Sequence, residues 1–196
     1  MLQIYTDKTL PDILDKIRKI GKEIIGPNAY DVDQKARFPS EALQALKAEK
    51  LFSAYVPKEY GGMGLCISDL AIICETLAHY CGSTAMIFAM HQIQVACIVH
   101  HAQSSKFFCH YLSELVEKQT LMASATTEIG IGGDLGSSLC AVKVTGEIFT
   151  LEKQAPVISY GAHANAILLT CRKSFEAQKN DQVLVLVKKE ACTQKP

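Results

Sequence analysis

Residues 121–134 read LMASATTEIGIGGD, and the pattern of the chain differs on either side of them. Leu121 to Thr127 is compatible with a β-strand, and the residues that follow form a loop with three glycines. Before this segment, apolar residues recur at the three-and-four spacing of helices, whereas after it they form short strand-like runs. The sequence therefore predicts a change from helical to β structure near residue 118.

Helical patterns dominate residues 1–118. Apolar residues from Leu10 to Ile24 lie on one helical face, and Pro11 stands in the first turn, where its missing N–H is tolerated. The Gly-rich segment VPKEYGGMG, residues 56–64, predicts a loop. We expect five helices, whose caps or first residues are Thr9, Ser40, Ser68, Ser83 and Ser105.

Short strands follow residue 118. Leu139–Thr145 and Ile148–Glu152 flank Gly146-Glu147 and predict a hairpin. Ala166–Arg172 and Val183–Lys188 are further strands. Because no helical pattern separates the strands, we expect an antiparallel sheet or barrel. The predicted fold class is α+β, with a helical domain over residues 1–118 and a β domain over residues 119–196.

So few strands leave one apolar face and two edges of a sheet to be covered. Two interpretations stay open. In one, this is a small α+β protein whose sheet packs on its own helices. In the other, the chain is the front part of something longer, and its β domain is incomplete.

Composition argues against a nucleic-acid-binding, a secreted and a membrane-spanning protein. The chain has 196 residues, 48% of them hydrophobic, with 20 basic and 20 acidic residues and no net charge. We therefore expect no nucleic-acid partner. Eight cysteines without a CxxC pair, and no signal-peptide pattern in the first ten residues, predict reduced thiols in a cytoplasmic protein. Polar residues interrupt the apolar run Thr84–Val99, which predicts a buried helix and no membrane span.

Motifs for metal or nucleophilic chemistry are missing. The sequence has no HExxH, zinc spacing, GxSxG, P-loop or strand-linked GxGxxG. We expect no metal site, and we expect His91 to be hydrogen-bonded within an apolar helix. The loop Thr126–Asp134 combines hydroxyl groups with glycines that let backbone N–H groups approach a ligand. It predicts either an anion-binding site or an ordinary Gly-rich loop.

The order of several motifs is similar to that of a known family. These motifs are FPS (38–40) before VPKEYGGMG (56–64), GSTA (82–85) before Met90-His91, ATTEIGIGGD (125–134), and VISYG (157–161) continuing to Arg172. The third resembles the flavin loop TEPxxGSD of the acyl-CoA dehydrogenases, and the fourth resembles their strand WITNG. The chain therefore resembles the N-terminal part of that family of flavoproteins.

The resemblance implies an architecture. Family members have an N-terminal helical domain, a middle β domain and a C-terminal helical bundle, with FAD held between the last two, often across a subunit interface. Residues 1–118 would be the helical domain and 119–196 an incomplete antiparallel middle domain. The resemblance places no part of the bundle in these 196 residues.

The resemblance also implies site residues. FAD would contact Ser124, Ala125, Thr126, Thr127, Gly132, Gly133, Val157, Ile158 and Ser159. Thr127 would offer its hydroxyl to the flavin ring, Gly132 and Gly133 their amides to the pyrophosphate, and Ser159 would replace a threonine that contacts flavin N5. Gly133 would also lie at the substrate. Asn165 and Arg172 are expected to be structural.

Three residues depart from the family pattern. Ile129 stands in place of a proline and loosens the turn. Gly133 replaces a serine and removes a hydroxyl donor. Val157 replaces a tryptophan and reduces the area that stacks on the flavin.

No catalytic residue is expected in this chain. In the family, a glutamate of the bundle takes the substrate α-proton while hydride leaves the β-carbon. Glu59, Glu75 and Glu128 do not match its position.

Three functions follow as hypotheses. The first is a fragment of an FAD-dependent oxidoreductase of fatty acid metabolism, acting on the CH–CH group of acyl-CoA, with an electron-transfer partner and a homo-oligomeric assembly. The second is a flavin-dependent monooxygenase of the same fold. The third is a non-catalytic truncated remnant or interaction module.

Overall fold

The computed structural model describes residues 6–101 and 104–193, so five of the ten N-terminal residues that lack a signal-peptide pattern lie outside it. The chain forms two compact units, residues 1–120 and 121–196.

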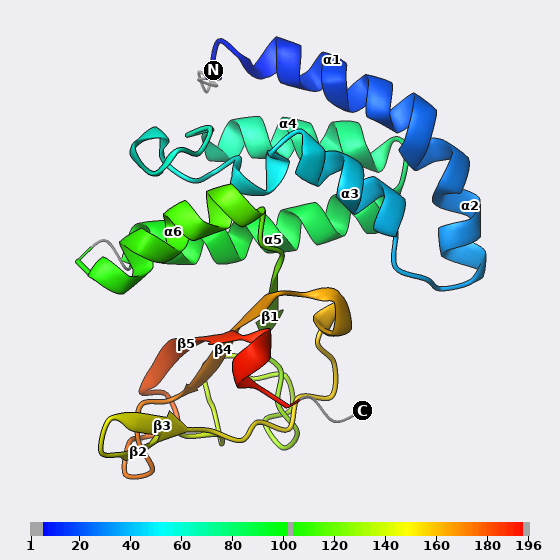
Figure 1. Ribbon diagram of the computed structural model, residues 1–196. Helices are drawn as coiled ribbons and strands as arrows, with labels where there is room; N and C mark the ends of the chain where they lie inside the picture. Colours follow the sequence, from blue (N-terminus) through cyan, green and yellow to red (C-terminus); the bar gives the residue numbers. More distant parts are fainter. Residues whose placement is uncertain (1–5, 102–103, 194–196) are drawn as a thin grey trace, which may run out of the picture. The chain divides into compact units, whose positions relative to one another are not determined.

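The first unit is helical (Figure 1). Its described α-helices are α1 (Leu10–Ile20), α2 (Gly26–Gln34), α3 (Ser40–Ala48), α4 (Ile67–Ala78), α5 (Gly82–His101) and α6 (Lys106–Lys118). A π-helical turn, Gly21–Ile25, joins α1 to α2, and two 3-10 turns, Leu51–Ser53 and Lys58–Tyr60, lie between α3 and α4. This agrees with the predicted helical character of the first part of the chain.

The long helix α5 carries the core of the first unit. Phe88, His91 and Val95 on this helix are fully buried. The Nε2–H of His91 donates to the carbonyl oxygen of Phe52 at 2.8 Å, and the two rings lie 5.1 Å apart. Burial lowers the pKa of His91 to about 4, against the smaller opposing effect of this bond. The prediction of a hydrogen-bonded histidine in an apolar helix is confirmed.

Helix starts test the predicted caps. Helix α3 begins at Ser40, Ser105 is the cap residue of α6, and α5 begins one residue before Ser83. The prediction that Ser68 caps the third helix is wrong. Cys66 is the cap residue of α4, because the carboxylate of Asp69 accepts its N–H at 2.9 Å.

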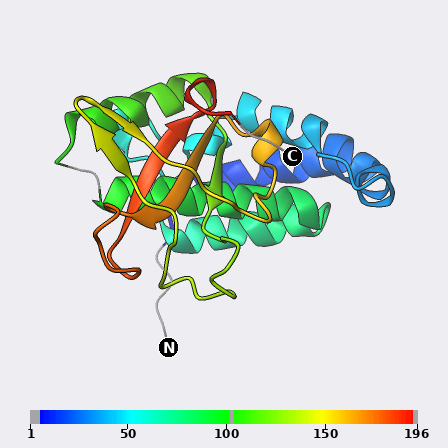
Figure 2. The ribbon, with the colours of Figure 1, turned by 90° about the horizontal axis from the view of Figure 1, so that it is seen from below.

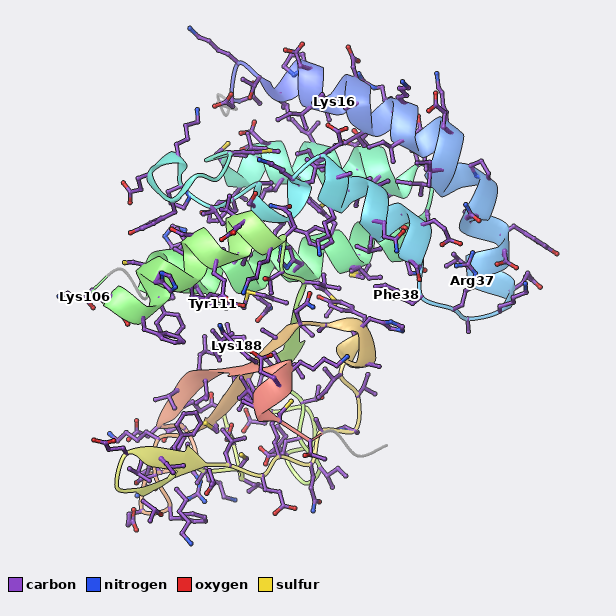
Figure 3. The ribbon with its side chains drawn as sticks, viewed as in Figure 1. Lys16, Arg37, Phe38, Lys106, Tyr111 and Lys188 are labelled. Carbon is purple, nitrogen blue, oxygen red and sulfur yellow. The ribbon has the colours of Figure 1, made fainter. Side chains whose placement is uncertain are left out.

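Charged side chains fix the connection between α2 and α3. Figure 3 labels Arg37 in this connection. Its guanidinium donates to Asp31 and, at 2.9 Å, to Glu41, and it also reaches the carbonyl oxygen of Phe38. The hydrogen bond from Arg37 lowers the pKa of Glu41. One arginine thereby joins the end of one helix to the start of the next.

Helix α5 is also the one helix among the described residues that is long and apolar enough to cross a membrane, judged by length and composition. In this structure, 56% of its most apolar window is buried inside the protein. That packing is typical of a core helix.

The second unit contains the strands β1 (Met122–Ala125), β2 (Lys143–Thr145), β3 (Ile148–Thr150), β4 (Ala166–Arg172) and β5 (Gln182–Lys188). Strands β1, β4 and β5 form a sheet in which β4 is central (Figure 2). Strands β2 and β3 form the predicted hairpin, with Gly146 at a φ of +64° in its turn. The α+β class is confirmed.

The prediction that the β segment is antiparallel throughout is wrong. Strand β1 pairs in parallel with β4, with Met122 opposite Ala166, whereas β4 and β5 are antiparallel. The 40-residue connection from β1 to β4 carries loops and the hairpin, so it is long enough for a parallel crossover without a helix.

Loop segments of the second unit cover one face of its sheet. Ala125, Leu169 and Cys171 from the sheet are buried in one cluster with Cys140 and Ala164. Among the residues packed against this cluster are Val142, Leu151, Ile158 and Tyr160. The unit therefore has a core of its own.

Candidate flavin site

The candidate site begins where the chain leaves β1. Three glycines of the following loop have left-handed backbone conformations, with φ of +93° at Gly130, +60° at Gly132 and +86° at Gly133. A Cβ on Gly132 or Gly133 would meet no atom within 4 Å. Within the described residues, the N–H groups of these two glycines donate to no protein acceptor. The loop therefore presents two exposed donors, as an anion-binding loop does.

The structure brings the two predicted segments together. The hydroxyl of Thr127 donates to the carbonyl oxygen of Val157 at 3.1 Å. The N–H of Ile129 donates to the carbonyl oxygen of Gln154 at 2.9 Å. A proline at position 129 could not donate this bond. The replacement of proline by Ile129 loosens the turn, and this hydrogen bond fixes it instead.

The predicted contact residues differ in exposure. Thr127, Gly132, Gly133, Val157 and Ser159 are exposed, and Val157 keeps 66% of its surface in solvent. Ser124 and Thr126 are half-buried. Ala125 is buried in the core and Ile158 packs against it, so their side chains support the wall from behind.

Tyr160 follows this wall directly and has a left-handed backbone with a φ of +45°. Its hydroxyl donates to the carbonyl oxygen of Met122 in β1 at 3.0 Å. Burial raises the pKa of this phenol well above its usual value. The side chain thereby ties the segment 157–159 to the sheet.

The two residues expected to be structural have contacts that fit this role. The side-chain oxygen of Asn165 accepts the N–H of Leu121 at 2.9 Å. The guanidinium of Arg172 donates to three carbonyl oxygens, each at 3.1 Å, those of Leu139, Phe175 and Ala177. Both side chains hold loops to the sheet.

Sequence reasoning missed the ion pair beneath the loop. Glu128 and Lys153 have only 5% of their side-chain surfaces exposed, and Nζ lies 3.5 Å from Oε2. The carboxylate also accepts two backbone N–H groups, from Leu139 at 3.0 Å and Cys140 at 2.6 Å. The position of Glu128 directly after two threonines gives no indication of these partners.

Comparison with known proteins places the chain in a family. The family described as "Acyl-CoA dehydrogenase, N-terminal domain" matches residues 8–119. A cyclohex-1-ene-1-carbonyl-CoA dehydrogenase of Syntrophus aciditrophicus is 31% identical over 157 residues, which are 79% of this chain and 37% of that protein.

Two solved structures share the fold. Butyryl-CoA dehydrogenase from Megasphaera elsdenii has a TM-score of 0.82 and 18% identity, over 96% of this chain and 50% of that one. PigA, solved with FAD and proline, has a TM-score of 0.76 and 17% identity, over 96% of this chain and 50% of that one. The chain thus spans half or less of the length of these proteins. It belongs to the acyl-CoA dehydrogenase family.

Proposed function

We propose that residues 124–133 and 157–159 form one wall of an FAD site in an oxidoreductase that acts on the CH–CH group of acyl-CoA thioesters. One observation carries the proposal. The loop with the two exposed N–H groups of Gly132 and Gly133 lies beside the segment 157–159, because the hydroxyl of Thr127 donates to the carbonyl oxygen of Val157. FAD carries a pyrophosphate and a planar ring, and these two segments offer an anion-binding loop and an exposed apolar side chain.

The residues present fit the cofactor. Gly132 and Gly133 have space in front of them, and their N–H groups have no competing acceptor among the described residues. These amides would hold the pyrophosphate, while the hydroxyl groups of Thr127 and Ser159 are exposed to orient the ring. When bound, FAD supplies the acceptor for the electrons removed from the acyl chain.

The chain's own glutamates do not supply the base. Both carboxylate oxygens of Glu128 accept backbone N–H groups and face Lys153. Glu59 and Glu75 are exposed on the first unit, whereas a base that takes a proton from carbon works in a pocket closed to water. We therefore assign no catalytic residue, and the proposed reaction uses a base from elsewhere.

An electron-transfer partner, a homo-oligomeric assembly and a location are part of the same proposal. Such an oxidoreductase passes its electrons to a protein partner. It works as a homo-oligomer, because one exposed wall buries only part of a cofactor and a second subunit can cover the rest. The cytoplasm is the proposed location, and the eight cysteines, all free thiols in the structure, are compatible with it.

Glycine variants test the cofactor site. In Gly132→Ala and Gly133→Ala, the added methyl group meets no protein atom but stands beside an exposed N–H. Gly146→Ala is the matched control, because Gly146 has a similar φ of +64° and equally open space in the β2–β3 turn. The readout is the quenching of FAD fluorescence by the purified chain.

We expect both loop variants to weaken FAD binding by about tenfold, because the methyl group keeps the pyrophosphate from approaching the N–H, and the control to leave it unchanged. Equal affinity in all four proteins would contradict the assignment of the pyrophosphate site. An assay with acyl-CoA, FAD and an artificial electron acceptor, supplemented with a family member's C-terminal bundle, then tests the reaction class.

A further inference from the structure

The buried ion pair beneath the flavin loop connects more of the site than its two residues. Lys153 donates from Nζ to the carbonyl oxygen of Thr170 at 2.8 Å and lies 3.4 Å from the hydroxyl of Thr170. That hydroxyl in turn donates to the carbonyl oxygen of Thr126 at 3.4 Å. Glu128 is held by Lys153 itself. The network therefore fixes the residues on both sides of Thr127.

Removing this network from solvent requires that its polar groups be satisfied. The carboxylate of Glu128 has three partners, namely two backbone N–H groups and the ammonium group. A buried carboxylate with such partners is retained in one geometry, because moving it would leave charges and N–H groups unpaired. The loop that carries Glu128 is consequently held against the segment 139–140 and against β4.

We infer that Glu128 and Lys153 are positioning residues for the proposed flavin site: they touch no cofactor, and they hold Thr127 and the loop 130–133 in the arrangement that binds the pyrophosphate. This inference rests on the proposed function. It assigns a role in ligand binding to a pair that would otherwise serve only to stabilise the β unit.

The decisive variant is Glu128→Gln. A glutamine amide has the same shape, but one of its two ends is an NH2 donor that faces a backbone N–H donor. It cannot accept from both Leu139 and Cys140, so the loop has to move. The matched control is Asp181→Asn, which breaks the exposed pair Lys173–Asp181 in the same unit, where the side chains are 59% and 40% exposed.

Two readouts separate positioning from stability. The first is hydrogen exchange of residues 128–134, where Ile129 and Asp134 donate backbone hydrogen bonds, compared with residues 166–172 of the central strand. The second is the FAD dissociation constant. In Glu128→Gln we expect faster exchange of residues 128–134, unchanged exchange of β4 and about tenfold weaker FAD binding. The control should match the wild type in both.

Because Glu128→Gln leaves Lys153 as a buried charge without its counter-ion, the variant could unfold the unit. The double variant Glu128→Gln/Lys153→Met removes that charge. We expect it to recover a folded β4 by exchange while FAD binding and loop protection stay impaired, because glutamine still cannot accept both N–H groups.

The inference would be overturned if residues 128–134 exchanged at the wild-type rate in Glu128→Gln. If Glu128→Gln unfolds the unit, the same result in the double variant would overturn it. Loss of loop protection with unchanged FAD affinity would also overturn it. If the wild type itself bound no FAD, the proposed function would fail, and the exchange data would still decide whether the pair positions the loop.

Discussion

The hydroxyl of Thr127 donates to the carbonyl oxygen of Val157 at 3.1 Å, across 30 residues of sequence. This bond joins the Gly-rich loop to the segment that continues through Ser159. Each segment alone has the features of an ordinary loop, whereas together they form a surface with exposed N–H groups, hydroxyl groups and an apolar side chain. The bond is therefore the geometric basis of the proposed site.

Replacing Thr127 with valine tests this bond. Thr127→Val keeps the shape of the side chain and removes the donor, and we expect a loss of about 1 kcal/mol in stability of the β unit and weaker FAD binding. Thr150→Val, at an exposed position of β3, is the control. Chemical denaturation and FAD titration measure both effects. A variant indistinguishable from this control would show that the bond does not hold the wall.

The buried His91 predicts a pH dependence of stability. Its pKa is about 4 in the folded chain and about 6.5 in the unfolded chain, so the unfolded state binds the proton more readily. The stabilisation from neutral His91 is present above pH 6.5 and is lost as the pH falls toward 4. By pH 5 we expect a loss on the order of 2 kcal/mol.

Urea unfolding at pH 7.0, 6.0 and 5.0 measures this slope. In His91→Gln, which does not titrate in this range, the loss between pH 7 and pH 5 should shrink by most of that amount. The same slope in both proteins would show that another group dominates.

Two glycines of the first unit have opposite surroundings. A Cβ on Gly62 would lie 2.0 Å from the carbonyl oxygen of Val56, whereas a Cβ on Gly82 would meet no atom within 4 Å. We expect Gly62→Ala to destabilise the helical unit by about 2 kcal/mol or more, because the contact is with backbone. Gly82→Ala, in the first turn of α5, should be neutral or slightly stabilising. Thermal unfolding compares them, and equal midpoints would contradict the close packing of the segment 56–64.

Exposed apolar side chains around the candidate site predict self-association. Ile129, Leu135 and Val157 are each more than half exposed; Ile129 and Val157 lie on the two segments of the proposed wall, and Leu135 lies two residues after the first segment. Light scattering should give an average mass that rises above 21.4 kDa with concentration. The double variant Ile129→Lys/Val157→Lys should reduce the rise, whereas Tyr30→Lys, at a 77% exposed residue of α2, should not. A constant monomer mass for the wild type would count against the proposed assembly.

Patterns with local causes were predictable from the sequence. The start of α3 at Ser40, the hairpin around Gly146 and the strand Ala166–Arg172 follow from spacing and turn residues. The cap at Cys66 was not, because it depends on the carboxylate of Asp69, three residues later, which accepts the N–H of Cys66. The parallel pairing of β1 with β4 also escaped, since strand direction across a long connection leaves no local pattern.

The candidate site was predictable only in part. The Gly-rich loop 130–133 and the segment 157–159 could be predicted because their motifs resemble those of a family. The Glu128–Lys153 pair could not, because burial and partners 12 and 25 residues away are set by tertiary packing.

The most direct test of the central claim is an equilibrium titration of the purified 196-residue chain with FAD and, in parallel, with riboflavin, which has the same ring and no phosphate. If the amides of Gly132 and Gly133 hold the pyrophosphate, FAD should bind saturably with a dissociation constant in the micromolar range, and riboflavin at least about tenfold more weakly. Equal binding of the two compounds, or no saturable binding of FAD, would contradict the account.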